Sequence, residues 1–143
     1  MRKIALDVGD KRIGVAVSDE LLITARGIAT IERVGIRKDA GKVIDLIKEY
    51  NCGTVVIGLP KKLDGTDSLQ TEKVYEFKTM LQNKMKSSSM GDVEIVYQDE
   101  RFTTVMAEKV LIEADVRRSK RREVIDKQAA VLILQGHLDG QKR

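Results

Sequence analysis

Three short β-rich segments at the start of the chain are followed by helical and strand-like segments in alternation, and few folds accommodate that order. Residues 4–8 and 13–17 are β-rich runs separated by a connection of four residues, which predicts a hairpin. Residues 23–31 supply a third strand, weakened at Gly27. These segments predict an antiparallel three-strand meander.

The rest of the chain alternates between helical and strand-like patterns. Apolar residues at helical spacing predict a helix over residues 36–50, and the unbroken apolar run 54–58 predicts a strand buried on both faces. The later segments are a helix around Val74, Phe77 and Leu81, a loop at 84–91, a strand at 93–97, and helices at 103–114 and 123–138. This order predicts an α/β fold with a mixed five-stranded sheet, its first strand central and helices on both faces.

Composition narrows the chemistry. The 143 residues indicate one domain, 1–143, with Cys52 as the only cysteine and His137 as the only histidine. A disulfide within the chain, a cysteine zinc cluster and a histidine-rich metal site are therefore excluded. The sequence shows neither an apolar run of membrane-spanning length nor a secretory leader, so we expect a cytoplasmic protein with no membrane partner. Catalysis must then use carboxylates with a hard cation, or other bound groups.

Four acidic residues are candidates for such a site. Asp7 interrupts an apolar strand, where a lone charge is costly unless a cation or strong donors compensate it. Asp99 and Glu100 lie at the end of the strand that begins at residue 93. Because side chains alternate along a strand, only one of the two can lie on the side of Asp7. Asp126 shares a helix face with small apolar residues, so that helix can approach the sheet closely.

Carboxylates that converge from separate elements form an oxygen-ligand set suited to Mg²⁺ or Mn²⁺. Asp7, Glu100 or Asp99, and Asp126 are the candidate catalytic and metal-binding residues. Each acid alone could instead cap a helix or join a salt bridge. Asp7 could also pair with Arg12 or accept hairpin amides.

Basic residues concentrate at the end of the chain. The net charge is +4, and residues 117–143 carry eight Lys or Arg against three acids. We expect Arg117, Arg118, Arg121 and Arg122 to bind a nucleic-acid backbone, although a solvated surface would have the same composition.

Other basic side chains are candidates for the same partner. Arg12 could hold a phosphate through two hydrogen bonds, or pair with Asp10 or Asp19. Arg101 could stabilise developing charge or form a salt bridge. Lys61 and Lys62 lie in the loop 59–68, which could contact a backbone and could also begin a helix capped by Asp67 or Ser68.

Four blocks in order resemble the YqgF family, bacterial relatives of Holliday junction resolvases that are also described as nucleases of pre-16S ribosomal RNA. They are residues 7–19 (DVGDKRIGVAVSD), 58–60 (GLP) with 64–66 (DGT), 99–104 (DERFTT) and 126–130 (DKQAA). The resemblance covers nearly the whole chain. It implies a ribonuclease H-like fold and metal-dependent phosphodiester hydrolysis.

The family's acidic positions correspond to Asp7, the pair Asp99 and Glu100, and Asp126. Many ribonuclease H-like nucleases carry an acid at the end of the fourth strand, where this sequence has the residues 58–60 (GLP). The resemblance therefore implies that the second metal ligand comes from the following strand.

We therefore predict a nuclease that acts on structured nucleic acid, with pre-16S ribosomal RNA as the favoured substrate and Mg²⁺ or Mn²⁺ as cofactor. The alternatives are a resolvase acting on DNA junctions and a non-catalytic RNA-binding factor of ribosome assembly. Sugar kinases and actin-like ATPases use two such domains around one nucleotide, and this chain supplies one. A monomer and a homodimer are both compatible with the sequence.

Overall fold

The computed structural model describes residues 1–62, 64–100 and 121–141, and of residues 121–127 it describes the helical backbone but not the side chains. The elements in chain order are β1 (Arg2–Val8), β2 (Arg12–Ser18), β3 (Ala25–Glu32), α1 (Ile36–Glu49), β4 (Cys52–Leu59), α2 (Leu69–Ser87), β5 (Glu94–Asp99) and α4 (Arg121–Gln141). No helix in this described part of the chain has the length and apolarity needed to cross a membrane.

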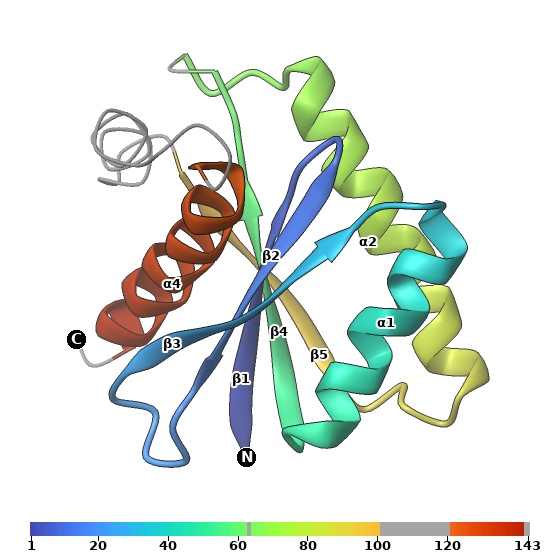
Figure 1. Ribbon diagram of the computed structural model, residues 1–143, viewed down its shortest axis with the longest axis vertical. Helices are drawn as coiled ribbons and strands as arrows, with labels where there is room; N and C mark the ends of the chain where they lie inside the picture. The colour runs from blue at the N-terminus through green and yellow to red at the C-terminus, as the bar shows by residue number, and fades with distance from the viewer. Residues whose placement is uncertain (63, 101–120, 142–143) are drawn as a thin grey trace.

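The five strands form one mixed sheet in the order β3-β2-β1-β4-β5 (Figure 1). The central strand β1 pairs antiparallel with β2 and parallel with β4, and β5 continues the parallel side. The predicted sheet, with its meander on one side and its first strand in the middle, is confirmed. The carboxyl ends of β1, β4 and β5 consequently lie at one edge, where ligands of open α/β sheets bind.

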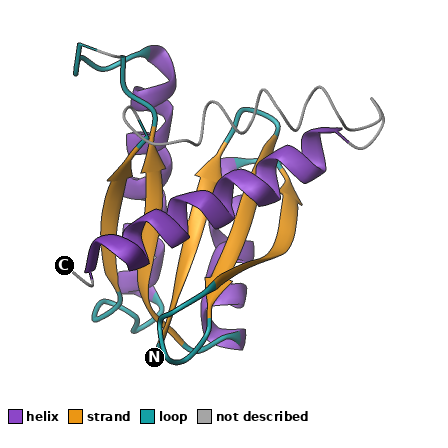
Figure 2. Ribbon diagram, turned by 90° about the vertical axis from the view of Figure 1, so that its left-hand side faces the viewer, coloured by secondary structure: helices purple, strands orange, loops and turns teal. Residues whose placement is uncertain are grey.

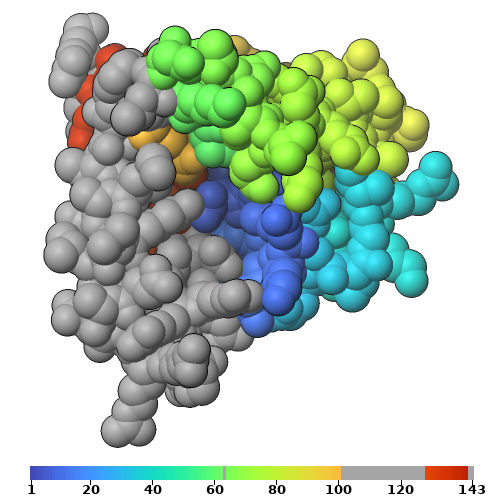
Figure 3. All heavy atoms as spheres, turned by 90° about the horizontal axis from the view of Figure 1, so that it is seen from above, coloured from blue at the N-terminus to red at the C-terminus, as the bar shows by residue number. Residues whose placement is uncertain are grey.

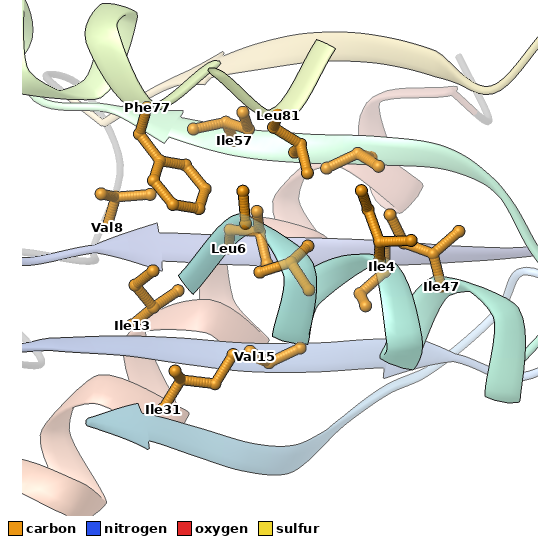
Figure 4. Close-up of a cluster of buried hydrophobic side chains, with 14 of the residues drawn as sticks. Ile4, Leu6, Val8, Ile13, Val15, Ile31, Ile47, Ile57, Phe77 and Leu81 are labelled. Atoms are coloured by element: carbon orange, nitrogen blue, oxygen red, sulfur yellow. The ribbon is translucent and has the colours of Figure 1, made fainter. Parts of the chain in front are cut away.

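Helices cover both faces of the sheet, as predicted. Helix α4 lies across one face, and α1 and α2 pack together on the other (Figure 2). Strand alternation separates the two cores: Ile4, Leu6 and Val8 of β1 face α1 and α2, whereas Ala5 faces α4. Figure 4 shows the larger core around Phe77 of α2.

The core beneath α4 is built from small side chains. Ala5 and Ala16 of the sheet meet Ala129 and Ala130 of the helix, and all four are buried. Ile133 follows on the same stripe and is fully buried. This is the packing stripe predicted for the last helix, and its small residues allow the helix axis to lie close to β1 and β2.

The structure corrects three details of the meander and its hairpin. The β1–β2 connection has three residues, 9–11, because Arg12 already pairs in β2. The third strand is Ala25–Glu32 rather than 23–31. A bulge lies in it, because Val15 pairs with Ala29 while Ala16 pairs with Gly27.

Two helices are longer than predicted. Helix α2 runs to Ser87, so residues 84–87 are helical and not part of a loop, and Met85 continues the buried stripe of the helix. Helix α4 runs from Arg121 to Gln141 instead of 123–138. The helix predicted at 103–114 lies outside the described residues.

Candidate active site

Asp7 and Glu100 lie on the same face of the sheet, at the carboxyl ends of its parallel strands. Asp7 is two residues beyond Ala5, so alternation points its side chain toward the α4 side. Glu100 follows β5, its N–H donates to the carbonyl of Leu59 at 3.2 Å, and its side chain is 5% exposed. Seen from above in Figure 3, the blue β1–β2 turn, the green segment after β4 and the orange end of β5 lie side by side.

Gly58 explains how Glu100 reaches over the neighbouring strand. A Cβ at position 58 would lie 3.0 Å from Glu100 Oε1 and 2.5 Å from Cδ1 of Ile133 in α4. The carboxylate of Glu100 therefore occupies space above β4 that a side chain at 58 would need. Gly58 directly follows Ile57, which pairs with Leu6, so this space adjoins Asp7.

Asp99 belongs to the opposite face. Tyr97, two residues earlier, packs its ring edge-on against Tyr75 of α2, with centroids 5.6 Å apart. Asp99 pairs with Leu59 in the β4–β5 ladder, and Leu59 belongs to the core beneath α1 and α2. Regular alternation thus separates the two adjacent acids and brings Glu100, rather than Asp99, to the side of Asp7.

The donor chemistry at this edge fits a hard divalent cation. Two carboxylates, one of them nearly buried, share the edge, and Mg²⁺ and Mn²⁺ prefer such oxygen ligands. Among the described side chains, no group of three or more His, Cys, Asp or Glu residues is close enough to hold a metal. Asp126 lies in α4, and its side chain is outside the described part, so a third ligand is not described.

The turn after Asp7 is held from the other face of the sheet. Arg33 Nη1 donates to the carbonyl of Gly9 at 3.0 Å, and Nε2 of Gln70 in α2 donates to the carbonyl of Val8 at 2.9 Å. Arg33 also pairs with the buried Asp39 at 3.1 Å. These contacts fix the end of β1 and therefore the position of Asp7.

Asp39 is ionised in this arrangement. Burial by itself raises the pKa of Asp39, but hydrogen bonds from the Val34 N–H and from Arg33 outweigh it and hold this pKa below its usual value. The sequence analysis did not single out Arg33, Asp39 or Gln70. An acid in the first turn of an amphipathic helix was the one available signal, and it also fits an ordinary helix-dipole interaction.

Arg12 has a partner that was not predicted. Its Nε donates to Glu32 Oε1 at 2.7 Å, so the suggested pairs with Asp10 or Asp19 are not formed. Asp10 instead pairs with Lys73 of α2 at 2.9 Å. Asp19 accepts hydrogen bonds from backbone N–H groups in its own loop.

The loop after β4 projects above the same edge of the sheet (Figure 2). Lys61 pairs with Asp67 at 3.7 Å, whereas Lys62 is exposed. Ser68 caps α2 and forms a capping box with Thr71, which confirms Ser68 over Asp67 as the cap. Lys62 therefore lies at the solvent-exposed part of this loop.

The remaining basic candidates cannot be placed at this site. Arg101, Arg117 and Arg118 lie outside the described residues. Arg121 and Arg122 begin α4, and their side chains are also outside the described part.

The cysteine and the histidine lie away from this edge. Burial raises the pKa of the Cys52 thiol to about 11, so it is not a nucleophile at neutral pH. His137 Nε2 is 3.0 Å from Nζ of Lys3, near the opposite end of β1, and burial together with Lys3 lowers its pKa. The candidate site at the carboxyl edge therefore includes neither Cys52 nor His137.

Comparisons with known proteins show what this chain is similar to. Residues 1–140 match the model of a family described as RuvX, Holliday junction resolvase. A protein of Clostridium tetani named "Putative pre-16S rRNA nuclease" is 46% identical over 139 residues, which cover 97% of this chain and 96% of the relative. A protein of Clostridioides difficile with the same name is 51% identical over 138 residues, with 96% and 94% covered.

Among solved structures, T. thermophilus RuvC in complex with Holliday junction substrate superimposes with a TM-score of 0.61 at 11% identity. The match covers 99% of this chain and 96% of that one. At this identity the likeness shows a shared fold, which is ribonuclease H-like.

Proposed function

The chain belongs to the RuvX (YqgF) family, and from this membership we propose that it is a metal-dependent nuclease that processes pre-16S ribosomal RNA in the cytoplasm. One observation carries the proposal: Asp7 and Glu100 lie on one face at the carboxyl edge of the sheet, with the Glu100 carboxylate above Gly58. The whole chain then acts as a single nuclease domain.

We assign Asp7, Glu100 and Asp126 as the ligands of Mg²⁺ or Mn²⁺. When bound, such an ion supplies an activated water and stabilises the leaving oxygen of a phosphodiester. The chain itself positions the substrate: Arg12 binds a phosphate beside the carboxylates, and Lys61 and Lys62 contact the backbone from the loop after β4. Arg101 follows Glu100 directly and is assigned to the same phosphates.

The test is a cleavage panel. Precursor 16S ribosomal RNA, single-stranded RNA and a four-way DNA junction are each incubated with the chain and Mn²⁺, Mg²⁺ or EDTA. We expect metal-dependent cleavage of the precursor RNA. Binding without cleavage under every condition would contradict a nuclease and favour a non-catalytic assembly factor.

A junction resolvase is the second candidate, because the matching family model carries that description. Metal-dependent cleavage of the four-way junction in preference to the RNA would favour it. A resolvase cuts symmetrically related strands, so this outcome would also require a homodimer. Sedimentation of the active species distinguishes a monomer from a dimer.

Gly58→Ala is expected to lower kcat/KM by about 10- to 100-fold, because small misplacements of reacting groups are costly. The added methyl would meet Glu100 Oε1 and Ile133 Cδ1 at 3.0 and 2.5 Å, so both must move. Such overpacking destabilises proteins by roughly 1–3 kcal/mol. Kinetics with Mn²⁺ and urea unfolding measure the two effects.

Gly136→Ala is the matched control for this variant. Gly136 lies in α4, on the same side of the sheet as Gly58. The atom nearest to its added methyl, Gln98 Nε2, would be 3.6 Å away. It is expected to cleave as the wild type does. Unchanged kcat/KM in Gly58→Ala would mean that the position of Glu100 above β4 is unimportant for cleavage.

Replacing Arg117, Arg118, Arg121 and Arg122 with Gln is expected to weaken binding to RNA and DNA alike. Each backbone phosphate contact contributes up to about one unit to the slope of log K against log salt, through counterion release. The variant's slope should therefore be shallower by as much as one unit per charge removed. Binding measured between low and moderate salt tests this, and an unchanged slope would identify the segment as a solvated surface.

A further inference from the structure

The ion pair of Arg12 with Glu32 lies on the face that carries Asp7. The two residues are direct partners in the β2–β3 ladder, and Nε of Arg12 is 2.7 Å from Oε1 of Glu32. Their neighbours Ile13 and Ile31 point into the core beneath α1 and α2. Alternation therefore directs both charged side chains to the α4 side, at the same edge as Asp7.

Within the β1–β2 hairpin, the positions between Arg12 and Asp7 on this face are the glycines Gly9 and Gly14. Asp7 pairs with Gly14 across the hairpin, and Gly9, in the connection directly after β1, donates its N–H to the carbonyl of Arg12 at 2.9 Å. Asp7 and Arg12 are thus diagonal neighbours, a separation that a long side chain can span. A phosphate bound by Arg12 would lie beside the carboxylate of Asp7.

The hydrogen bond to Glu32 orients the guanidinium group of Arg12. It uses Nε, and no described residue accepts a hydrogen bond from either Nη nitrogen of Arg12. The two Nη groups are the donors that remain for a phosphate, which arginine binds through parallel N–H bonds when its plane is correctly turned.

Stability is a poor explanation for this pair. The side chains are 24% and 61% exposed, and exposed ion pairs contribute about 0–1 kcal/mol. A carboxylate beside a nucleic-acid site also repels the substrate, so its presence there needs a compensating role.

Resting on the proposed nuclease function, we propose that Glu32 is a positioning residue that turns Arg12 so that its Nη nitrogens hold a backbone phosphate of the substrate beside Asp7. Glu32 itself does not touch the substrate. Its effect passes entirely through Arg12.

The test compares Glu32→Ala with Glu32→Gln. Both remove a negative charge, but the glutamine amide oxygen can still accept the hydrogen bond from Arg12 Nε. We expect Glu32→Ala to weaken RNA binding about 3- to 10-fold, the order expected for losing a charge-assisted contact, whereas Glu32→Gln binds as tightly as the wild type. Binding is measured in EDTA and kcat/KM in Mn²⁺, so that affinity and cleavage are separated.

Asp10→Ala is the matched control, because it also removes an exposed ion pair near the same turn, with Lys73. It is expected to leave binding unchanged or slightly tighter, as the loss of a negative charge alone predicts. In an Arg12→Ala background, Glu32→Ala should have no further effect. Melting curves establish that every variant is folded.

Two results overturn the proposal. If Glu32→Ala and Glu32→Gln bind equally, or both bind more tightly than the wild type, Glu32 acts only as a charge. If Glu32→Ala still weakens binding in the Arg12→Ala background, it does not act through Arg12. A wild-type chain that binds none of the nucleic acids in the panel would instead refute the proposed function itself, and the role of Glu32 with it.

Discussion

Asp7→Asn is expected to abolish Mn²⁺-dependent cleavage while the chain stays folded. Asparagine has nearly the same shape as aspartate, so the central strand and its pairing with Gly14 are retained. The variant loses the negative charge that we assign to the cation. Losing several kcal/mol of charge stabilisation corresponds to a decrease of about 10³-fold in rate.

Three measurements separate this effect from misfolding. Cleavage is followed with Mn²⁺, unfolding is followed in urea, and Mn²⁺ affinity is determined for the wild type and the variant. Asp10→Asn, three residues further along, serves as the control, because Asp10 pairs with Lys73 and is expected to have no part in cleavage. Wild-type activity in a folded Asp7→Asn protein would remove Asp7 from the site.

The architecture could be predicted because its main signals are local. Short β-rich apolar runs in β1 and β2, the apolar run in β4 and helical spacing in α1 each indicate one element type. The order of the elements then leaves few sheet topologies. The position of the bulge in β3 was not predictable, because the sequence does not show whether Gly27 or Ile28 pairs with Ala16.

The prediction of a loop at residues 84–91 was wrong for residues 84–87, which belong to α2. The reason is physical. Three serines and a glycine make up half of the segment and lower its helix propensity, yet Met85 is 2% exposed and packs in the core beneath α1 and α2. Lys84 also donates to the carbonyl of Arg37 in α1 at 3.2 Å. Tertiary contacts therefore extend α2 beyond the point at which local propensity favours a loop.

At the candidate site, Asp7 could be singled out from the sequence, whereas the residues that contact its turn could not. A charged residue within an apolar strand is visible in a single sequence, whereas Arg33, Gln70 and Glu32 act through contacts between distant segments. The role of Gly58 was equally hidden, because it depends on a side chain from the next strand lying above it.

Asp99 and Glu100 show the limit of strand alternation applied to sequence. A shift of one residue in the end of β5 exchanges the faces of both acids. The β4–β5 register and the contact of Tyr97 with Tyr75 resolve the faces, placing Glu100 on the side of Asp7. The catalytic roles of the two acids then become a testable difference.

Glu100→Gln is expected to abolish cleavage with almost no loss of stability. Glutamine matches the shape of the nearly buried glutamate, so the space above Gly58 stays filled while the charge is lost. As with Asp7, the missing carboxylate should lower the cleavage rate by about 10³-fold. The measurement is kcat/KM with Mn²⁺, paired with urea unfolding of the same preparation.

Asp99→Asn is the natural comparison, because it makes the same chemical change one residue earlier on the opposite face. Asp99 precedes the segment 103–114 for which the sequence predicts a helix, and we expect it to cap the turn into that segment. Asparagine caps a helix about as well as aspartate, so Asp99→Asn should keep its stability and much of its cleavage, whereas Asp99→Ala should lose about 0.5–2 kcal/mol of stability. Glu100→Gln and Asp99→Asn should therefore differ in activity and not in stability: both stay folded, the first is inactive and the second is active. An inactive but stable Asp99→Asn protein beside an active Glu100→Gln protein would reverse the assignment and make Asp99 the partner of Asp7.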